Sequence, residues 1–111
     1  MFRITPDPVF TATVALSVRG SDAQAEVPFR FRHLGRKALS AFRARIESDK
    51  LDDDVVLAEI IDGWDDVVDA NGNAVPYSAA ALAQMLDDHP AASTEIWNGY
   101  LAALLDYRRG N

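Results

Sequence analysis

The segment that most invites a chemical function is GWDDVVDANGNAVPYS, residues 63–78, which combines several aspartates with an Asn-Gly pair. Calcium is bound by oxygen ligands at alternating positions of a tight loop. With Asp69 as the first ligand, Asn71 and Asn73 take the third and fifth positions. Ala74 and Ala80, however, stand where a calcium loop needs a glycine and a glutamate. The spacing therefore does not predict a calcium site.

The other residue types that catalyse reactions form no recognisable set. His33 and His89 are the only histidines, and neither belongs to a metal-binding helical pair or to a glycine-framed serine motif. The chain has no cysteine, which excludes disulfides and thiolate chemistry. Its glycines are dispersed, so they predict no phosphate-binding loop. We expect no catalytic residue, no cofactor and no metal.

Two hypotheses that do involve chemistry remain open. A small-ligand-binding or regulatory domain would need a pocket near Trp64 or Trp97, although aromatic residues at helix ends and on helical stripes usually belong to the core. A hydrolase would need Asp66, His89 or similar groups to converge in a cleft.

Length, charge and hydropathy limit the partners. The 111 residues suit a single domain, residues 1–111, and the net charge of −6 disfavours binding to a phosphate backbone. Basic residues gather at positions 36–45 and at Arg108-Arg109, where a solvated helix face and a helix C-terminus explain them. No run approaches membrane-spanning length, and Pro6 and Pro8 interrupt the stretch where a signal peptide would need apolar residues. We expect neither nucleic acid nor membrane as a partner.

Strict alternation of apolar and polar residues predicts two strands, residues 10–18 and 27–31, joined as a hairpin across the polar GSDAQ segment. A turn at Ser21 and Asp22 would place Val14 opposite Phe29, but a two-residue slip keeps the same match, so the register stays open. Pro28 has no N–H to donate, which favours an edge position for the return strand.

Apolar residues at intervals of three and four then predict four helices. The first begins near Leu34, the second follows the acidic caps at residues 52–54, the third ends near His89-Pro90, and the last runs from about Ala92 to Arg108. Gly110 is placed to terminate the last helix.

Residues 63–78 are then expected to form a joint between two helices. Gly63 is expected as the left-handed residue that ends a helix, with Trp64 packing back on the last turn. Asn71-Gly72 suits the turn of a small hairpin, Asp69 can accept neighbouring N–H groups, and Ser78 can cap the next helix. The predicted fold class is therefore α+β, with an N-terminal β-hairpin, about four α-helices and a small central β-hairpin in one domain.

The order of these parts resembles that of a known family. It is carried by FRITPDPVFTATVALSV, VPFRFRHLGRKALSAF, IIDGWDDVVDANGNAVPYSAAALAQML and IWNGYLAALLDYRRGN. Together they resemble the tail assembly chaperones of long-tailed bacteriophages and their prophages, nearly end to end. The most specific parts are Pro8 and Phe10, residues 29–33, and Gly63-Trp64 followed by Gly72, Pro76 and Ser78.

The resemblance implies a non-enzymatic protein in the cytoplasm of an infected or lysogenic bacterium. Such chaperones hold the tape-measure protein soluble, help recruit tail-tube subunits and are absent from the mature virion. The resemblance carries over no catalytic residue and does not locate the partner-binding surface. Together with the edge strand inferred from Pro28, it implies weak self-association through that edge or through exposed helical apolar stripes. The resemblance also implies a longer frameshifted form, for which the codons available at residues 109–111 permit a slippery heptamer. The residues that we expect to matter structurally are Gly63, Trp64, Asp69, Gly72, Pro76 and Ser78.

Overall fold

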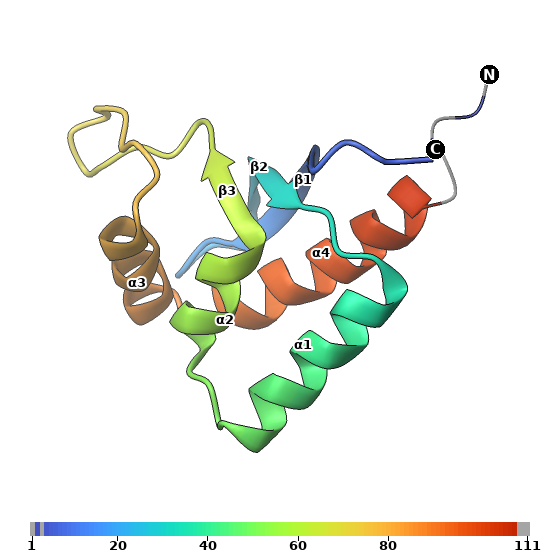
Figure 1. Cartoon of the computed structure of the whole chain (residues 1–111). Helices are drawn as coiled ribbons and strands as arrows, with labels where there is room; N and C mark the ends of the chain where they lie inside the picture. Colours follow the sequence, from blue (N-terminus) through green and yellow to red (C-terminus); the bar gives the residue numbers. More distant parts are fainter. Residues whose placement is uncertain (1, 3, 109–111) are drawn as a thin grey trace.

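Three strands and four helices lie within residues 2 and 4–108, the part of the chain that the computed structural model describes (Figure 1). The elements are β1 (Val9–Ser17), β2 (Gln24–Arg32), α1 (Arg36–Ser48), α2 (Asp53–Ile60), β3 (Ile61–Trp64), α3 (Ala79–Asp88) and α4 (Ala92–Arg108). Within the described residues the strands form one antiparallel sheet in the order β1-β2-β3. The α+β prediction, with its N-terminal hairpin, is confirmed.

The hairpin adopts the slipped register that the sequence left open. Val14 lies opposite Val27, and Ala12 lies opposite Phe29. This register centres the connection on Gly20-Ser21 instead of Ser21-Asp22, and residues 18–23 join the two strands. The connection bends at Gly20, whose φ of 76° is the left-handed conformation that glycine adopts without steric cost.

The placement of β2 at a sheet edge, inferred from Pro28, is wrong, because β2 is the middle strand. His33 N–H donates to Pro8 O, which fixes the alternation of the β1–β2 ladder and turns the backbone of Pro28 toward β3. β3 ends at Trp64, and Asp65 N–H donates to the Pro28 carbonyl over 3.0 Å. Pro28 thus lies opposite a residue just beyond the end of β3, where the sheet needs no N–H donor from it.

The interpretation of Gly63 as a helix C-terminal residue is also wrong. α2 ends at Ile60 and the chain continues at once into β3, where Gly63 pairs with Arg30 and has no positive φ. A Cβ at Gly63 would collide with the Arg30 guanidinium, so the glycine lets this side chain lie across β3. Trp64 accordingly packs within the sheet rather than on the end of a helix.

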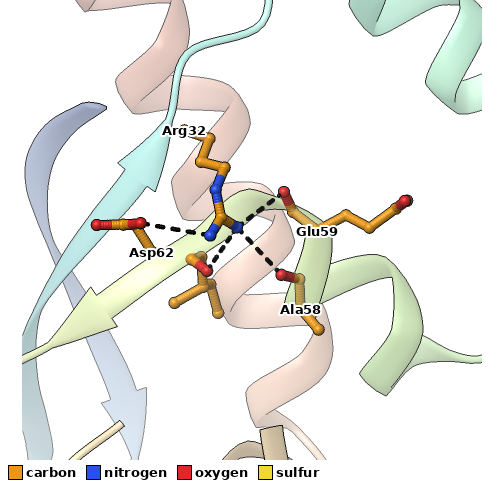
Figure 2. Close-up of polar contacts among 5 residues, drawn as sticks. Arg32, Ala58, Glu59 and Asp62 are labelled. Atoms are coloured by element: carbon orange, nitrogen blue, oxygen red, sulfur yellow. Dashed lines mark hydrogen bonds and ion pairs between the residues drawn. The ribbon is translucent and has the colours of Figure 1, made fainter. Parts of the chain in front are cut away.

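A guanidinium group completes the end of α2 instead of a glycine (Figure 2). Arg32 Nη1 donates to the carbonyls of Ala58, Glu59 and Ile61 at 3.3, 3.2 and 2.9 Å, and Nη2 lies 3.3 Å from Asp62 Oδ1. The last carbonyls of a helix have no partner within the helix. Arg32 supplies the donors that allow a direct change from helix to strand.

The core lies on one face of the sheet, where α2 and α4 pack. Val14, Phe29 and Phe31 are buried there, whereas Thr11 and Thr13 face solvent from the same hairpin. α4 approaches β1 closely at Gly99, where an added Cβ would lie 2.8 Å from Val14 Cγ2. Figure 1 shows α1 alongside α4, and α3 beyond α2.

The small central hairpin is a turn closed by one antiparallel bridge, Val68 to Ala74. Asp69 Oδ1 accepts the N–H groups of residues 71 and 73 at 2.9 and 3.0 Å, and Gly72 has a φ of 80°. Ser78 Oγ then accepts Ala81 N–H over 3.0 Å at the start of α3. The segment thus changes direction through local hydrogen bonds.

The ends of the other helices differ partly from expectation. Asp52 is the N-cap of α2 but makes no side-chain capping hydrogen bond, so the acids at this end act through the helix dipole. At the other end of the chain, Arg108 donates to Leu34 O over 2.6 Å. The expected roles of Arg109 and Gly110 lie outside the described residues.

Candidate functional site

An apolar groove lies between the turn end of the β1–β2 hairpin, residues 64–75 and α3. Its cavity volume is about 600 Å³. Leu16 and Val27 form its wall on the sheet, Trp64 lies behind them, and Val68 and Met85 face it from the loop and from α3. These residues come from four separate parts of the sequence, and the fold gathers them where α3 leaves part of the sheet uncovered. We refer to this feature as the α3 groove.

The polar residues that line the α3 groove carry mostly negative charge. Asp66, Asp69 and Asp88 all border it, together with His89, and the described lining residues include no lysine or arginine. Asp69 already accepts two backbone N–H groups in the turn. Asp66 and Asp88 are exposed, so their carboxylates can meet a ligand from solvent.

Trp64 is held firmly in the wall of the groove. Its Nε1–H donates to Val75 O over 2.8 Å, and its ring meets Tyr77 edge-on with 5.0 Å between centroids. Burial raises the pKa of the Tyr77 hydroxyl. The charge of Arg32 lowers this pKa by a smaller amount, and the charge of Asp62 raises it slightly. Because the indole N–H is satisfied within the chain, Trp64 offers a ligand only its apolar surface.

A second, smaller hollow lies beside Trp97 between α1, α2 and α4. Its volume is about 320 Å³, and its lining includes Arg43, Asp53 and Ser93. Ser93 Oγ donates to Asp53 Oδ2 over 2.7 Å, and the Trp97 ring packs against Phe42. The polar groups of this hollow thus join α2 to α4.

The structure brings Asp66 and His89 to the same groove, as the hydrolase hypothesis requires, and Ser17 also lines it. Within residues 2 and 4–108, however, no hydrogen bond or ion pair connects any two of these three side chains. Ser17 Oγ instead donates to Glu95 Oε2 over 2.5 Å. Ser17, Asp66 and His89 are therefore not linked to one another as a nucleophile and its base.

His33 lies far from the groove, against the Tyr107 ring. Burial, with a smaller contribution from the Arg108 charge, lowers the pKa of His33. Within the part of the chain that the structure describes, no group of three or more His, Cys, Asp or Glu residues is arranged to hold a metal ion.

The six residues singled out as a structural motif occupy different positions around the segment. Trp64 and Asp69 line the α3 groove, whereas Gly63 lies beneath Arg30, and Gly72 and Ser78 serve a turn and a helix start. Pro76 is exposed between half-buried neighbours. Sequence reasoning missed Val68, Met85 and Asp88 as groove residues, because their common surface depends on how α3 packs. The one sequence feature that pointed to this surface was the surplus of apolar residues beside aspartates in residues 63–78.

No helix in the described part of the chain is long and apolar enough to cross a membrane.

With this geometry established, comparison with known proteins assigns the family. The model of the phage tail assembly chaperone family matches residues 1–111, the whole chain. No curated protein and no solved structure matches the chain. The chain belongs to the phage tail assembly chaperone family.

Proposed function

We propose that this protein acts without catalysis, in the cytoplasm of the bacterial host, by binding the tape-measure protein and the tail-tube subunits of its phage during tail assembly. The proposal includes release of the chaperone before the virion is complete. The observation that carries it is family membership over the full length of the chain. The α3 groove supports it, because a concave apolar surface is suited to binding another polypeptide.

The function is tested by co-expressing the chain with the tape-measure protein of the same phage. We expect the soluble fraction of the tape-measure protein to rise, and the two proteins to elute together in size-exclusion chromatography. A small acidic protein of unrelated fold, expressed at the same level, controls for general effects of charge. A tape-measure protein that stays insoluble, with no complex formed, contradicts the proposal.

Recruitment of the tail-tube protein requires a separate measurement. We expect the purified complex of chaperone and tape-measure protein to retain tail-tube subunits that the tape-measure protein alone does not retain. Mass photometry of the assembled tails should then show no mass attributable to the chaperone. A chaperone that remains in finished tails contradicts the release step.

The small-ligand alternative has a hollow beside each tryptophan, but Asp53 and Ser93, two polar residues of the Trp97 hollow, already bond to each other. Among the described residues no buried side-chain nitrogen or oxygen lacks a hydrogen-bond partner. Small-molecule sites usually combine an apolar cavity with a few convergent polar groups. A metabolite panel that shifts tryptophan fluorescence or raises the melting temperature would revive this alternative.

A further inference from the structure

We propose that the α3 groove binds an amphipathic helical segment of the partner protein, with Lys or Arg residues flanking its apolar face. The inference rests on the proposed chaperone function and specifies where, and by what chemistry, the client is recognised. Three properties of the groove support it: uncovered apolar surface, carboxylates at its border, and walls that offer no continuous strand edge.

The apolar surface of the groove is more exposed than a self-contained core requires. Val68 has 58% of its surface exposed and Val18 39%, and both line the groove. Trp64 is only 4% exposed and supports them from behind. A hollow with apolar walls and a firm base favours insertion of apolar side chains from another molecule.

The charge at the border selects among apolar segments. Asp66 and Asp88 are exposed on two different walls, one in the loop and one at the end of α3. No lysine or arginine stands among the described lining residues to neutralise them. Complementary charges favour the right partner and repel wrong ones. An apolar segment flanked by Lys or Arg fits this border, whereas one flanked by acids does not.

The walls favour a helix over an extended segment. An added strand would need unpaired backbone N–H and C=O groups. Here one wall is α3, whose backbone bonds to itself, and the opposite wall is the paired end of β1 and β2. In the loop wall, Val75 N–H donates to Val67 O and Asp69 N–H donates to Asn73 O, so this wall is no continuous strand edge. This arrangement favours recognition through side chains, as when a helix lies in a groove with anchors spaced along one face.

Fluorescence of Trp64 gives a direct measure of occupancy. Trp97→Phe leaves Trp64 as the only tryptophan, and Trp97 lies in the other hollow. The probes are synthetic peptides that together tile the tape-measure protein of the same phage. We expect emission to shift only with peptides that place apolar residues at helical spacing beside Lys or Arg. Their affinity should fall as salt rises, because exposed charges are screened.

Two kinds of variant separate the apolar and the charged contributions. Val68→Asp puts a charge on the exposed apolar wall and should weaken binding at least about tenfold. Asp66→Asn with Asp88→Asn removes two carboxylates without changing volume, and should weaken binding about threefold to tenfold at low salt. Asparagine also tolerates the left-handed backbone of Asp66, whose φ is 61°. The matched control, Glu47→Gln with Asp106→Asn, makes the same change of charge away from the groove and should bind as the parent does.

The outcomes separate this inference from the chaperone function. Binding that is equal in the Asp66→Asn, Asp88→Asn variant and its control, or selection of acidic peptides, overturns the inference. So does sedimentation showing that Val68→Asp abolishes self-association, because the groove would then hold a second copy. If no peptide shifts Trp64 while co-expression still keeps the tape-measure protein soluble, the groove assignment falls and the chaperone function stands. Circular dichroism verifies that each variant is folded, and the isosteric asparagine pair remains informative if Val68→Asp is not.

Discussion

Arg32 takes the place of a capping residue at the end of α2. Its guanidinium donates to three backbone carbonyls and pairs with Asp62, so one side chain joins β2 to both α2 and β3. The planar fork of arginine can address several oxygens at once, which a lysine ammonium does with less geometric control. The contact is partly exposed, because 45% of the Arg32 side chain is accessible to solvent, and this moderates its strength.

We predict that Arg32→Ala lowers the free energy of unfolding by about 1–2 kcal/mol, because helix carbonyls lose charged donors. Arg32→Lys should recover part of the loss, since it keeps the charge but not the fork. Urea denaturation followed by circular dichroism measures both. Equal stability of the alanine variant and the wild type would show that water satisfies these carbonyls.

Tyr100 makes stability depend on pH in the alkaline range. Its hydroxyl donates to Arg32 O over 2.9 Å, and burial raises its pKa from 10.0 to about 12 despite the opposing charge of Arg108. The folded state therefore favours the neutral phenol. Its contribution to stability is complete below the unfolded-state pKa and is lost as pH rises through the folded-state value.

We predict that the stability advantage of wild type over Tyr100→Phe is largest below pH 10 and shrinks between pH 10 and 12. The measurement is the free energy of unfolding of both proteins across that range. Because the pKa of Tyr77 is also raised by burial, Tyr77→Phe provides a second background for the comparison. A constant difference would mean that Tyr100 ionises as easily in the folded state as in the unfolded one.

The roles of several residues could be predicted from the sequence because their hydrogen bonds are local. Asp69 and Ser78 bond to N–H groups within four positions of themselves, so the pattern that predicts them lies in one short window. Arg32 contacts residues 26 to 30 positions away, and Trp64 is placed by Val75 and the sheet. No local pattern reports such contacts.

At the scale of elements, α4 and β1 depend on a glycine between them. The Cβ of an alanine at position 99 would lie 2.8 and 3.1 Å from the two methyl groups of Val14, which is buried and β-branched. Alanine normally stabilises a helix interior by about 0.5–1 kcal/mol relative to glycine. Overpacking a core costs about 1–3 kcal/mol, so the steric term should prevail.

We therefore predict that Gly99→Ala destabilises the fold by about 1 kcal/mol, opposite in sign to the helix propensity. In a Val14→Ala background the same substitution should be neutral or stabilising, because the methyl groups that it meets are gone. Thermal and urea unfolding of the four proteins complete a double-mutant cycle. Additive effects would show that the helix shifts away instead of clashing.

The hairpin and the four helices were predictable, because each carries its own hydrophobic period. β3 was not, since Ile61 continues the apolar run of α2 and the Asp62-Gly63 pair that follows has the composition of a helix end. Gly63 looked like a helix stop because a glycine at that point usually is one. Pro28 led to the wrong prediction of an edge strand for a related reason. A proline excludes one backbone hydrogen bond, but a neighbouring strand can still pair with the rest of β2 if it ends before it reaches the proline.

For the whole molecule, the outer edge of β1 is the surface most open to pairing. Since Phe10, Val14 and Leu16 bond toward β2, the backbone groups of Thr11, Thr13 and Ala15 point away from the sheet. The strand VFTATVALS has no charge and no proline. Natural edge strands usually carry charged residues or prolines, which prevent pairing with another chain. Glu95 closes only the last position, by accepting Ser17 N–H.

We predict weak, concentration-dependent self-association through this edge. Thr13→Lys should suppress it, because two antiparallel copies centred on Thr13 would bring the lysines face to face. Gln24→Lys is the matched control, since it adds the same charge to β2 at the turn end of the hairpin, away from the edge. Sedimentation velocity over a range of concentrations measures the effect. Equal association of both variants would exclude the β1 edge.

The close packing of α4 against β1 has a consequence for the order of synthesis. The ribosome makes β1 well before α4, yet Phe10 stacks on Tyr107 at 4.9 Å, and Ser17 bonds to Glu95. While residues 33–91 are being translated, the apolar face of the nascent hairpin has no α4 to cover it. The native core can close only after Tyr107 leaves the exit tunnel, so the native fold, including the packing of α4 on the hairpin, forms after translation of α4.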